Sequence, residues 1–152
     1  TVRLQKQRFT GTSEPFAVAW SDRQDMATCQ VKLNGTGQVG TTMKVTFSDP
    51  YSPGGPAIGA ASLSSLPGYL AIPDGFMVPL GPDALFVASA SGVFPGFRGS
   101  LNYSGDMSGS MKIPKINELR GIEIHLAMAV FRSGSSGDIV RGVSPAVKFK
   151  IQ

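Results

Sequence analysis

The chain has 152 residues, of which 41% are apolar and only 16% charged, with 19 glycines and 11 prolines. This length suits a single domain over residues 1–152 with a hydrophobic core of its own, and the composition excludes both a charged helical bundle and a disordered chain. The net charge of +4 is scattered along the sequence, without the focused basic stripe that nucleic-acid binding needs.

Residues 1–9, TVRLQKQRF, are the first segment expected to be extended. Val2 and Leu4 fall on one face of a strand and Phe9 on the other, so the alternation breaks along the segment. An arm that cannot complete its own strand pattern suits addition to the sheet edge of a neighbouring subunit. Pairing within the chain's own sheet explains the same residues equally well.

Three more strands are expected at 15–20, 27–33 and 42–48. The last of these is the clearest, because its apolar residues alternate with polar ones, as in a half-buried strand. Asn34 and Gly35 readily adopt positive φ angles, so they predict a tight hairpin between the second and third of these strands.

Residues 49–83 break the regular succession of expected strands. They contain seven of the 11 prolines, at positions 50, 53, 56, 67, 73, 79 and 82. Proline lacks the main-chain donor that a central strand needs, so much of this segment is expected to be loop or edge. A long Pro/Gly-rich loop with this many apolar residues either covers the core or forms a contact surface.

Strands follow at 75–80, 84–90 and 99–104, and no segment predicts a helix. The strand at 121–131 contains His125, the single histidine of the chain, on the same face as Glu123. We interpret His125 as structural, because a general base needs a positioned partner and a reacting group within reach. The opposite face is wholly apolar and is expected in the core: Ile122, Ile124, Leu126, Met128 and Val130.

The last expected strand spans 145–152, with Val147, Phe149 and Ile151 on one face and lysines on the other. It is expected at a sheet edge, where lysines discourage uncontrolled pairing. Closely spaced strands without helices predict an all-β fold, namely an antiparallel β-sandwich of the Ig-like or jelly-roll-like kind with a long Pro-rich loop.

Catalytic, metal and cofactor sites are not predicted. Cys29 is the only cysteine, which excludes an internal disulfide, and its apolar strand predicts a small buried side chain rather than a nucleophile. Aspartates are distributed over several loops without the spacing of a calcium-binding loop. No apolar run reaches the length of a membrane span.

A candidate ligand platform lies in the sequence GVFPGFRGSLNYSGD. Three aromatic residues and an arginine among glycine and proline suit an exposed surface for carbohydrate, and a hydrophobic plug at one end of the core explains them as well. Asn34 and Asn102 begin N-glycosylation tripeptides. The platform residues are Phe94, Phe97, Arg98 and Tyr103.

Taken together, these features favour a non-enzymatic structural subunit. It is expected to assemble with copies of itself through strand or arm exchange, into an extracellular filament, pilus-like fibre or coat. The alternative is a secreted module that binds carbohydrate or a cell surface through the platform.

Overall fold

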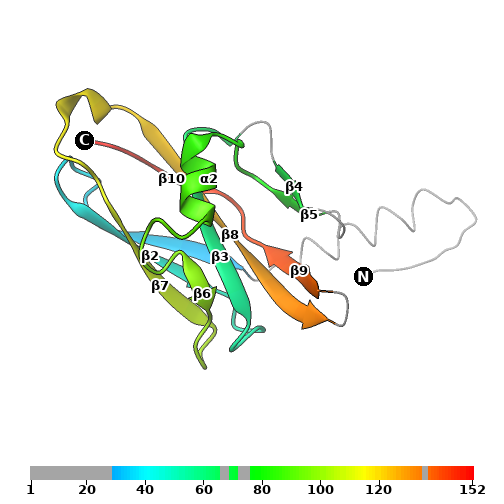
Figure 1. Ribbon diagram of the computed structural model, residues 1–152. Coiled ribbons are helices and arrows are strands. Elements are labelled where there is room, and N and C mark those ends of the chain that lie inside the picture. The colour runs from blue at the N-terminus through cyan, green and yellow to red at the C-terminus, as the bar shows by residue number, and fades with distance from the viewer. Residues whose placement is uncertain (1–28, 66–68, 72–75, 135–136) are drawn as a thin grey trace, which may run out of the picture.

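The structure is a computed structural model, and it describes residues 29–65, 69–71, 76–134 and 137–152. Within these residues the chain is mostly antiparallel strand, so the predicted all-β class is confirmed (Figure 1). The elements are β1 (Gln30–Asn34), β2 (Thr42–Ser48), β3 (Pro56–Ser62), β4 (Tyr69–Ala71), β5 (Phe76–Val78), α2 (Ala84–Ala90), β6 (Arg98–Ser100), β7 (Asp106–Lys112), the 3-10 helix η1 (Asn117–Leu119), β8 (Glu123–Gly134), β9 (Gly137–Val143) and β10 (Val147–Lys150).

One sheet has the order β1-β2-β7. The predicted pairing of β1 with β2 is confirmed, with Asn34 opposite Lys44. The connection between the two strands runs from Gly35 to residue 41, so it is longer than the tight hairpin we expected. Its bends occur at Gly35, Gly37 and Gly40, which have positive φ angles. Strand β7 pairs with the other side of β2, with Met43 opposite Met111.

The second sheet has the order β10-β8-β3-β6, and β9 also pairs with β8. The long strand β8 is its centre, because β3 lies on one side and β9 and β10 follow one another along the other side. The prediction for β8 is confirmed: one face is apolar and buried from Ile124 to Val130, and Ile122 packs partly buried against the same cluster. Strands β4 and β5 form a separate two-stranded sheet.

The main core contains side chains from both large sheets. Phe47 of β2 and Phe97 are fully buried and meet edge to face, with ring centroids 5.1 Å apart. Strand β3 contributes small residues at this place, and Gly59 makes room for Phe47: a β-carbon on Gly59 would come within 2.2 Å of the Phe47 ring. The small residues of β3 therefore set how closely the sheets approach.

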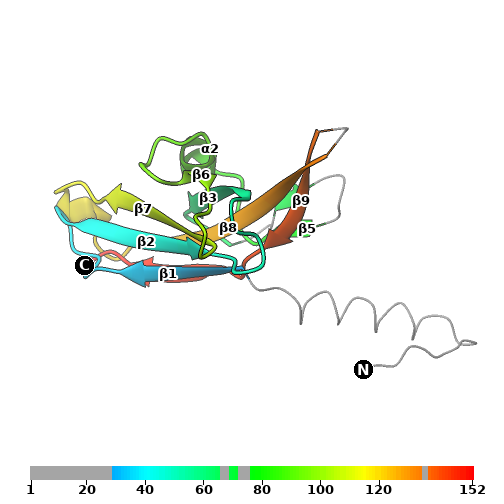
Figure 2. The same cartoon turned by 90° about the horizontal axis from the view of Figure 1, so that it is seen from below.

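The segment 84–90, for which we predicted a strand, is helix α2, so the prediction that the chain has no helix is wrong. Asp83 begins the helix by accepting a hydrogen bond from the Phe86 N–H, at 2.9 Å. Phe86 and Ala90 then pack on a second, smaller core cluster around Leu80. Figure 2 shows α2 on the side of the five-stranded sheet that faces away from β1 and β2.

The segment 49–83 is not one long loop, because it contains β3, β4 and β5. Strand β3 even lies inside the larger sheet, between β8 and β6. Pro56 is its first residue, the position where a missing main-chain donor costs least. We expected a strand at 99–104, but β6 covers only Arg98–Ser100 and a turn follows it.

Candidate functional site

The predicted assembly arm, with Val2, Leu4 and Phe9, lies outside the described residues. The predicted edge strand, with Val147, Phe149 and Ile151, is described. Strand β10 stands at the end of the five-stranded sheet and pairs with β8 on one side, with Lys148 opposite His125. Within the described part of the chain, no strand pairs with its other side.

The direction of the main-chain groups follows from the residues just after β10. Ile151 donates to the Ile122 carbonyl at 2.9 Å, so its main chain faces β8. Gln152 faces the opposite way, since its N–H donates to the carbonyl of Gly37. Because these directions alternate along a strand, the N–H and C=O of Lys148 also point outward. We call this outward side of Val147–Lys150 the β10 edge.

Apolar side chains accompany the β10 edge. Ile151 is buried, and Val147 and Phe149 pack partly buried against the main core. On the other face, the ammonium group of Lys148 lies 3.2 Å from the carboxylate of Glu123. The β10 edge therefore combines outward main-chain groups with a partly exposed apolar seam, as an acceptor of an added strand requires.

On the lateral side away from β10, the chain segment just before β6 connects the two sheets through main-chain hydrogen bonds. The Ser110 N–H of β7 donates to the Pro95 carbonyl at 2.9 Å, and the Gly59 N–H of β3 donates to the Phe97 carbonyl at 2.6 Å. On the β10 side, the described residues place Gly37 and Val39 against Gln152, and none of them pairs with the outward side of Val147–Lys150.

The predicted ligand platform is not assembled as expected. Phe97 lies at 0% exposure in the core, so it cannot present its ring to a ligand, and Phe94 packs partly buried beside it with ring centroids 5.3 Å apart. Arg98 is exposed and its guanidinium lies 3.4 Å from the Ala90 carbonyl. Tyr103 is fully exposed on the following turn. The platform interpretation is therefore wrong for Phe97, and the ring instead fills the space against Phe47, as the alternative of a hydrophobic plug implies.

His125 lies beside Glu123, with 3.8 Å between Nε2 and Oε1. Its cross-strand neighbour is Ser62, which is fully buried and whose hydroxyl lies 2.8 Å from the Asp83 carboxylate. A serine hydroxyl that is enclosed and turned to another carboxylate is not placed for nucleophilic attack. The geometry around His125 is that of a packed polar group on the sheet surface.

Cys29 is buried, as its strand predicted. Burial raises the pKa of its thiol to about 12, and the negative charge of Asp49, whose Oδ2 lies 3.7 Å from Sγ, adds to the shift. The thiol therefore stays protonated at neutral pH and is not a nucleophile.

Two turns meet at one end of the sheets, and each presents an exposed tyrosine: Tyr51 at 70% and Tyr103 at 101% exposure. The turn after β2 and the turn after β6 are joined by main-chain hydrogen bonds, from Gly54 to the Leu101 carbonyl at 3.0 Å and from Asp49 to the Gly105 carbonyl at 2.8 Å. We use the name tyrosine end for residues 51–56 and 102–105 together with Arg132 and Arg141.

Each turn of the tyrosine end is also fixed internally. The Asp49 carboxylate accepts hydrogen bonds from the Ser52 hydroxyl at 2.7 Å and from the Tyr51 N–H at 3.2 Å. The Asn102 side chain accepts from the N–H groups of Ser104 and Asp106, at 2.8 and 3.0 Å. These bonds hold the turns in one conformation before any partner arrives.

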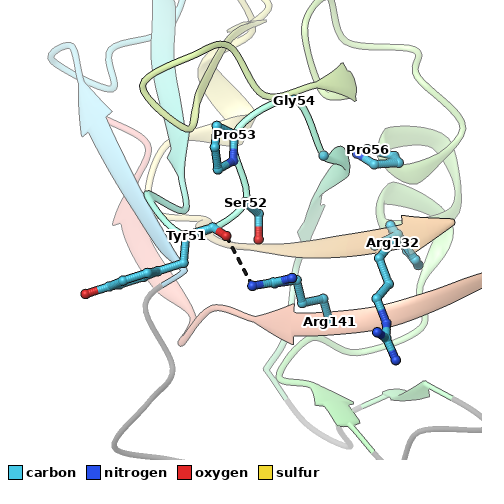
Figure 3. A pocket seen from close by; sticks show the side chains of 9 residues that line it. Tyr51, Ser52, Pro53, Gly54, Pro56, Arg132 and Arg141 are labelled. Carbon is cyan, nitrogen blue, oxygen red and sulfur yellow. Dashed lines mark hydrogen bonds between the residues drawn. The ribbon is translucent and has the colours of Figure 1, made fainter.

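A shallow groove of about 300 Å³ lies beneath the first turn, with Arg132 and Arg141 on its other wall (Figure 3). Arg141 is the extra residue of a β-bulge, because Val130 pairs with Gly142 and Phe131 with Val140. Its Nη2 donates to the Tyr51 carbonyl at 3.1 Å. In Figure 3 Arg141 points toward this carbonyl, while the Tyr51 ring points away from the groove.

Within the described residues, neither of these arginines forms an ion pair, since the ion pairs found there all involve Glu123. The same part of the chain holds no group of three potential metal ligands. It also contains no helix long and apolar enough to cross a membrane.

The tyrosine end is a cationic and aromatic surface, because it combines two exposed tyrosines with two arginines. The sequence indicated Tyr103 as a platform residue and 49–83 as a candidate contact surface, but it did not bring the two turns together or point to Arg132 and Arg141.

A comparison of the sequence with protein-family models finds no match, and a comparison with curated proteins finds none that is significantly similar. Functional reasoning about this chain therefore starts from its own geometry.

Proposed function

We propose that the chain is a non-enzymatic β-sandwich subunit that assembles with copies of itself outside the cytoplasm, by adding residues 1–9 of one copy to the β10 edge of the next. The observation that carries this proposal is the outward main chain of Lys148 beside the partly buried Val147 and Phe149. An added strand gains main-chain hydrogen bonds and covers this apolar seam.

The asymmetry of the two lateral edges supports this choice. Residues 95–97 already bond to both sheets on one side, whereas no strand of the described part of the chain pairs with the outward side of β10, where an incoming strand can add. A contact between the arm of one copy and the edge of another joins different surfaces, so it leaves each copy with an unused arm and an unused edge. Such contacts propagate into filaments or close into shells.

Charge gives the assembly a characteristic salt dependence. The arm contains Arg3, Lys6 and Arg8, and the receptor strand contains Lys148 and Lys150. Like charges repel when the two strands approach, and added salt screens this repulsion. We therefore expect association to strengthen as salt rises, the opposite of an assembly that depends on ion pairs.

The substitution Lys148→Pro tests the proposal, with Lys148→Ala as its matched control. Both changes remove the ion pair with Glu123, but only proline removes the outward N–H, and proline is tolerated at such positions of edge strands. In sedimentation velocity we expect Lys148→Ala to assemble like the unmodified chain and Lys148→Pro to remain monomeric with an unchanged melting temperature. Equal assembly of both variants would contradict strand addition at the β10 edge.

A further inference from the structure

We propose that the tyrosine end is a docking surface for a carboxylate-rich segment of a partner protein. It is separate from the β10 edge, so the domain has one surface for self-assembly and another for a different partner. Tyrosine and arginine are the side chains that most often dominate the binding energy of protein interfaces. Here Tyr51 and Tyr103 lie on turns built from glycine, serine, asparagine and proline, and Arg132 of β8 and Arg141 of β9 lie beside the first of these turns.

The two turns of the tyrosine end are preorganised. Gly105 has a φ of 82° and a β-carbon there would come within 2.3 Å of the Asp49 carbonyl, so the two turns are packed backbone against backbone. Tyr51 and Tyr103 are thus presented from a fixed base although their rings are exposed. Rigid aromatic side chains on such turns lose little conformational entropy when a partner binds.

The charge of the tyrosine end favours a partner that carries carboxylates. Arg132 and Arg141 stand together at the groove, and Arg141 bonds to a neutral main-chain carbonyl rather than to a carboxylate. The Asp49 carboxylate nearby is buried and turned toward Ser52 and Cys29. No carboxylate of the described residues forms an ion pair with either guanidinium group, and a planar carboxylate matches the fork of an arginine.

The size and layout of the surface favour protein over a nucleic acid or a sulfated glycan. Polyphosphate and polysulfate ligands need a stripe of several basic residues. The groove has two arginines on one wall, and its other wall is formed by prolines, glycines and Ser52. A groove of about 300 Å³ accommodates one or two carboxylate side chains, while the tyrosine rings outside it cover the flanking main chain.

Fluorescence anisotropy with labelled hexaglutamate, against hexaglutamine as the neutral probe, tests this surface. We expect hexaglutamate to bind and hexaglutamine to bind at least about tenfold more weakly. The substitutions Arg132→Gln and Arg141→Gln should each weaken hexaglutamate binding by about threefold to tenfold, and Tyr103→Ala by at least about threefold.

The matched control is Arg120→Gln, which removes the same charge next to η1, at the opposite end of the strands (Figure 1). We expect it to change binding by less than about twofold, because separated exposed charges are screened. Equal losses from Arg120→Gln and Arg132→Gln would overturn the proposal, since only net charge would then matter. Tighter binding of a labelled heparin hexasaccharide than of hexaglutamate, with the same arginine dependence, would also overturn it and assign the surface to polyanionic glycans.

Discussion

Ser89 of α2 accepts a hydrogen bond from the main-chain N–H of Ala61 in β3, with 2.8 Å between Oγ and N. Strand β6 pairs with β3 only from Pro56 to Ile58, so Ala61 lies beyond its reach. The helix thus supplies a side-chain acceptor where the sheet lacks one. This bond explains why a short helix is fixed to an otherwise all-β domain.

Replacing Ser89 with alanine should lower the free energy of unfolding by about 1–3 kcal/mol, because the buried N–H of Ala61 loses its acceptor. Urea denaturation measures the change. Ser91→Ala is the control, since the Ser91 hydroxyl bonds to Val87 at the surface and its loss should cost less than about 0.5 kcal/mol. Equal losses in the two variants would refute this role of Ser89.

Gly59→Ala should destabilise the protein by about 1–3 kcal/mol or more, because Phe47 is held by Phe97 and cannot yield to a new β-carbon. Gly99→Ala on the neighbouring strand introduces a β-carbon 3.6 Å from the Met107 sulfur, an ordinary contact, and should be nearly neutral. Thermal unfolding of the two variants distinguishes them. A stable Gly59→Ala protein would show that the sheets separate more easily than their packing implies.

Asp83 should make stability depend on acid pH. Partial burial alone would raise the pKa of Asp83, but hydrogen bonds from Phe86, Ser62 and Leu63 outweigh it and hold this pKa below its ordinary value of 3.8. The ionised carboxylate therefore contributes stability above about pH 4, and this contribution is lost as the pH falls through the folded-state pKa. Asp83→Asn keeps a helix cap but cannot titrate, so its unfolding free energy should fall less steeply with acid. Identical acid profiles would rule out this contribution.

Cys29 should make stability depend on alkaline pH. Its folded-state pKa of about 12 exceeds the ordinary value of 9.0, so the unfolded chain releases a proton that the folded chain keeps. Stability is complete below pH 9.0 and declines toward pH 12, by about 1 kcal/mol between about pH 9 and pH 10. Cys29→Ala should lose this part of the alkaline decline. Iodoacetamide should also label Cys29 only after denaturation, and rapid labelling of the native protein would contradict the buried, protonated thiol.

The strands with large alternating side chains were predictable from sequence. In β2, and in β8 from Ile124 to Val130, every second residue is apolar and buried, and period-two alternation specifies such strands directly. Strand β7 was missed because Gly109, which faces Phe97, lies between its two buried methionines and carries no side chain to mark the pattern. Helix α2 was mistaken for a strand because its seven residues are too few to distinguish the helical period of 3.6 from the strand period of 2. Asp83, directly before it, is a residue type that favours the N-cap of a helix.

The tyrosine end was not predictable for a different reason. Tyr51 and Tyr103 belong to turns far apart in sequence that meet through main-chain hydrogen bonds. Arg141 reaches the groove because a β-bulge shifts the pairing of β9 against β8. Neither the strand order nor the bulge leaves a local signal in the sequence. For Phe97 the sequence left two interpretations, an exposed platform and a hydrophobic plug, and the buried ring fits the second.

Addition of the arm of one copy to the β10 edge of another can be measured by mixing two variants. A chain without residues 1–9 keeps the edge but has no arm, and Lys148→Pro keeps the arm but has no usable edge. We expect each variant alone to sediment as a monomer and their equimolar mixture to form a one-to-one heterodimer that grows no further. A mixture that remains monomeric, while the unmodified chain assembles, would contradict the account.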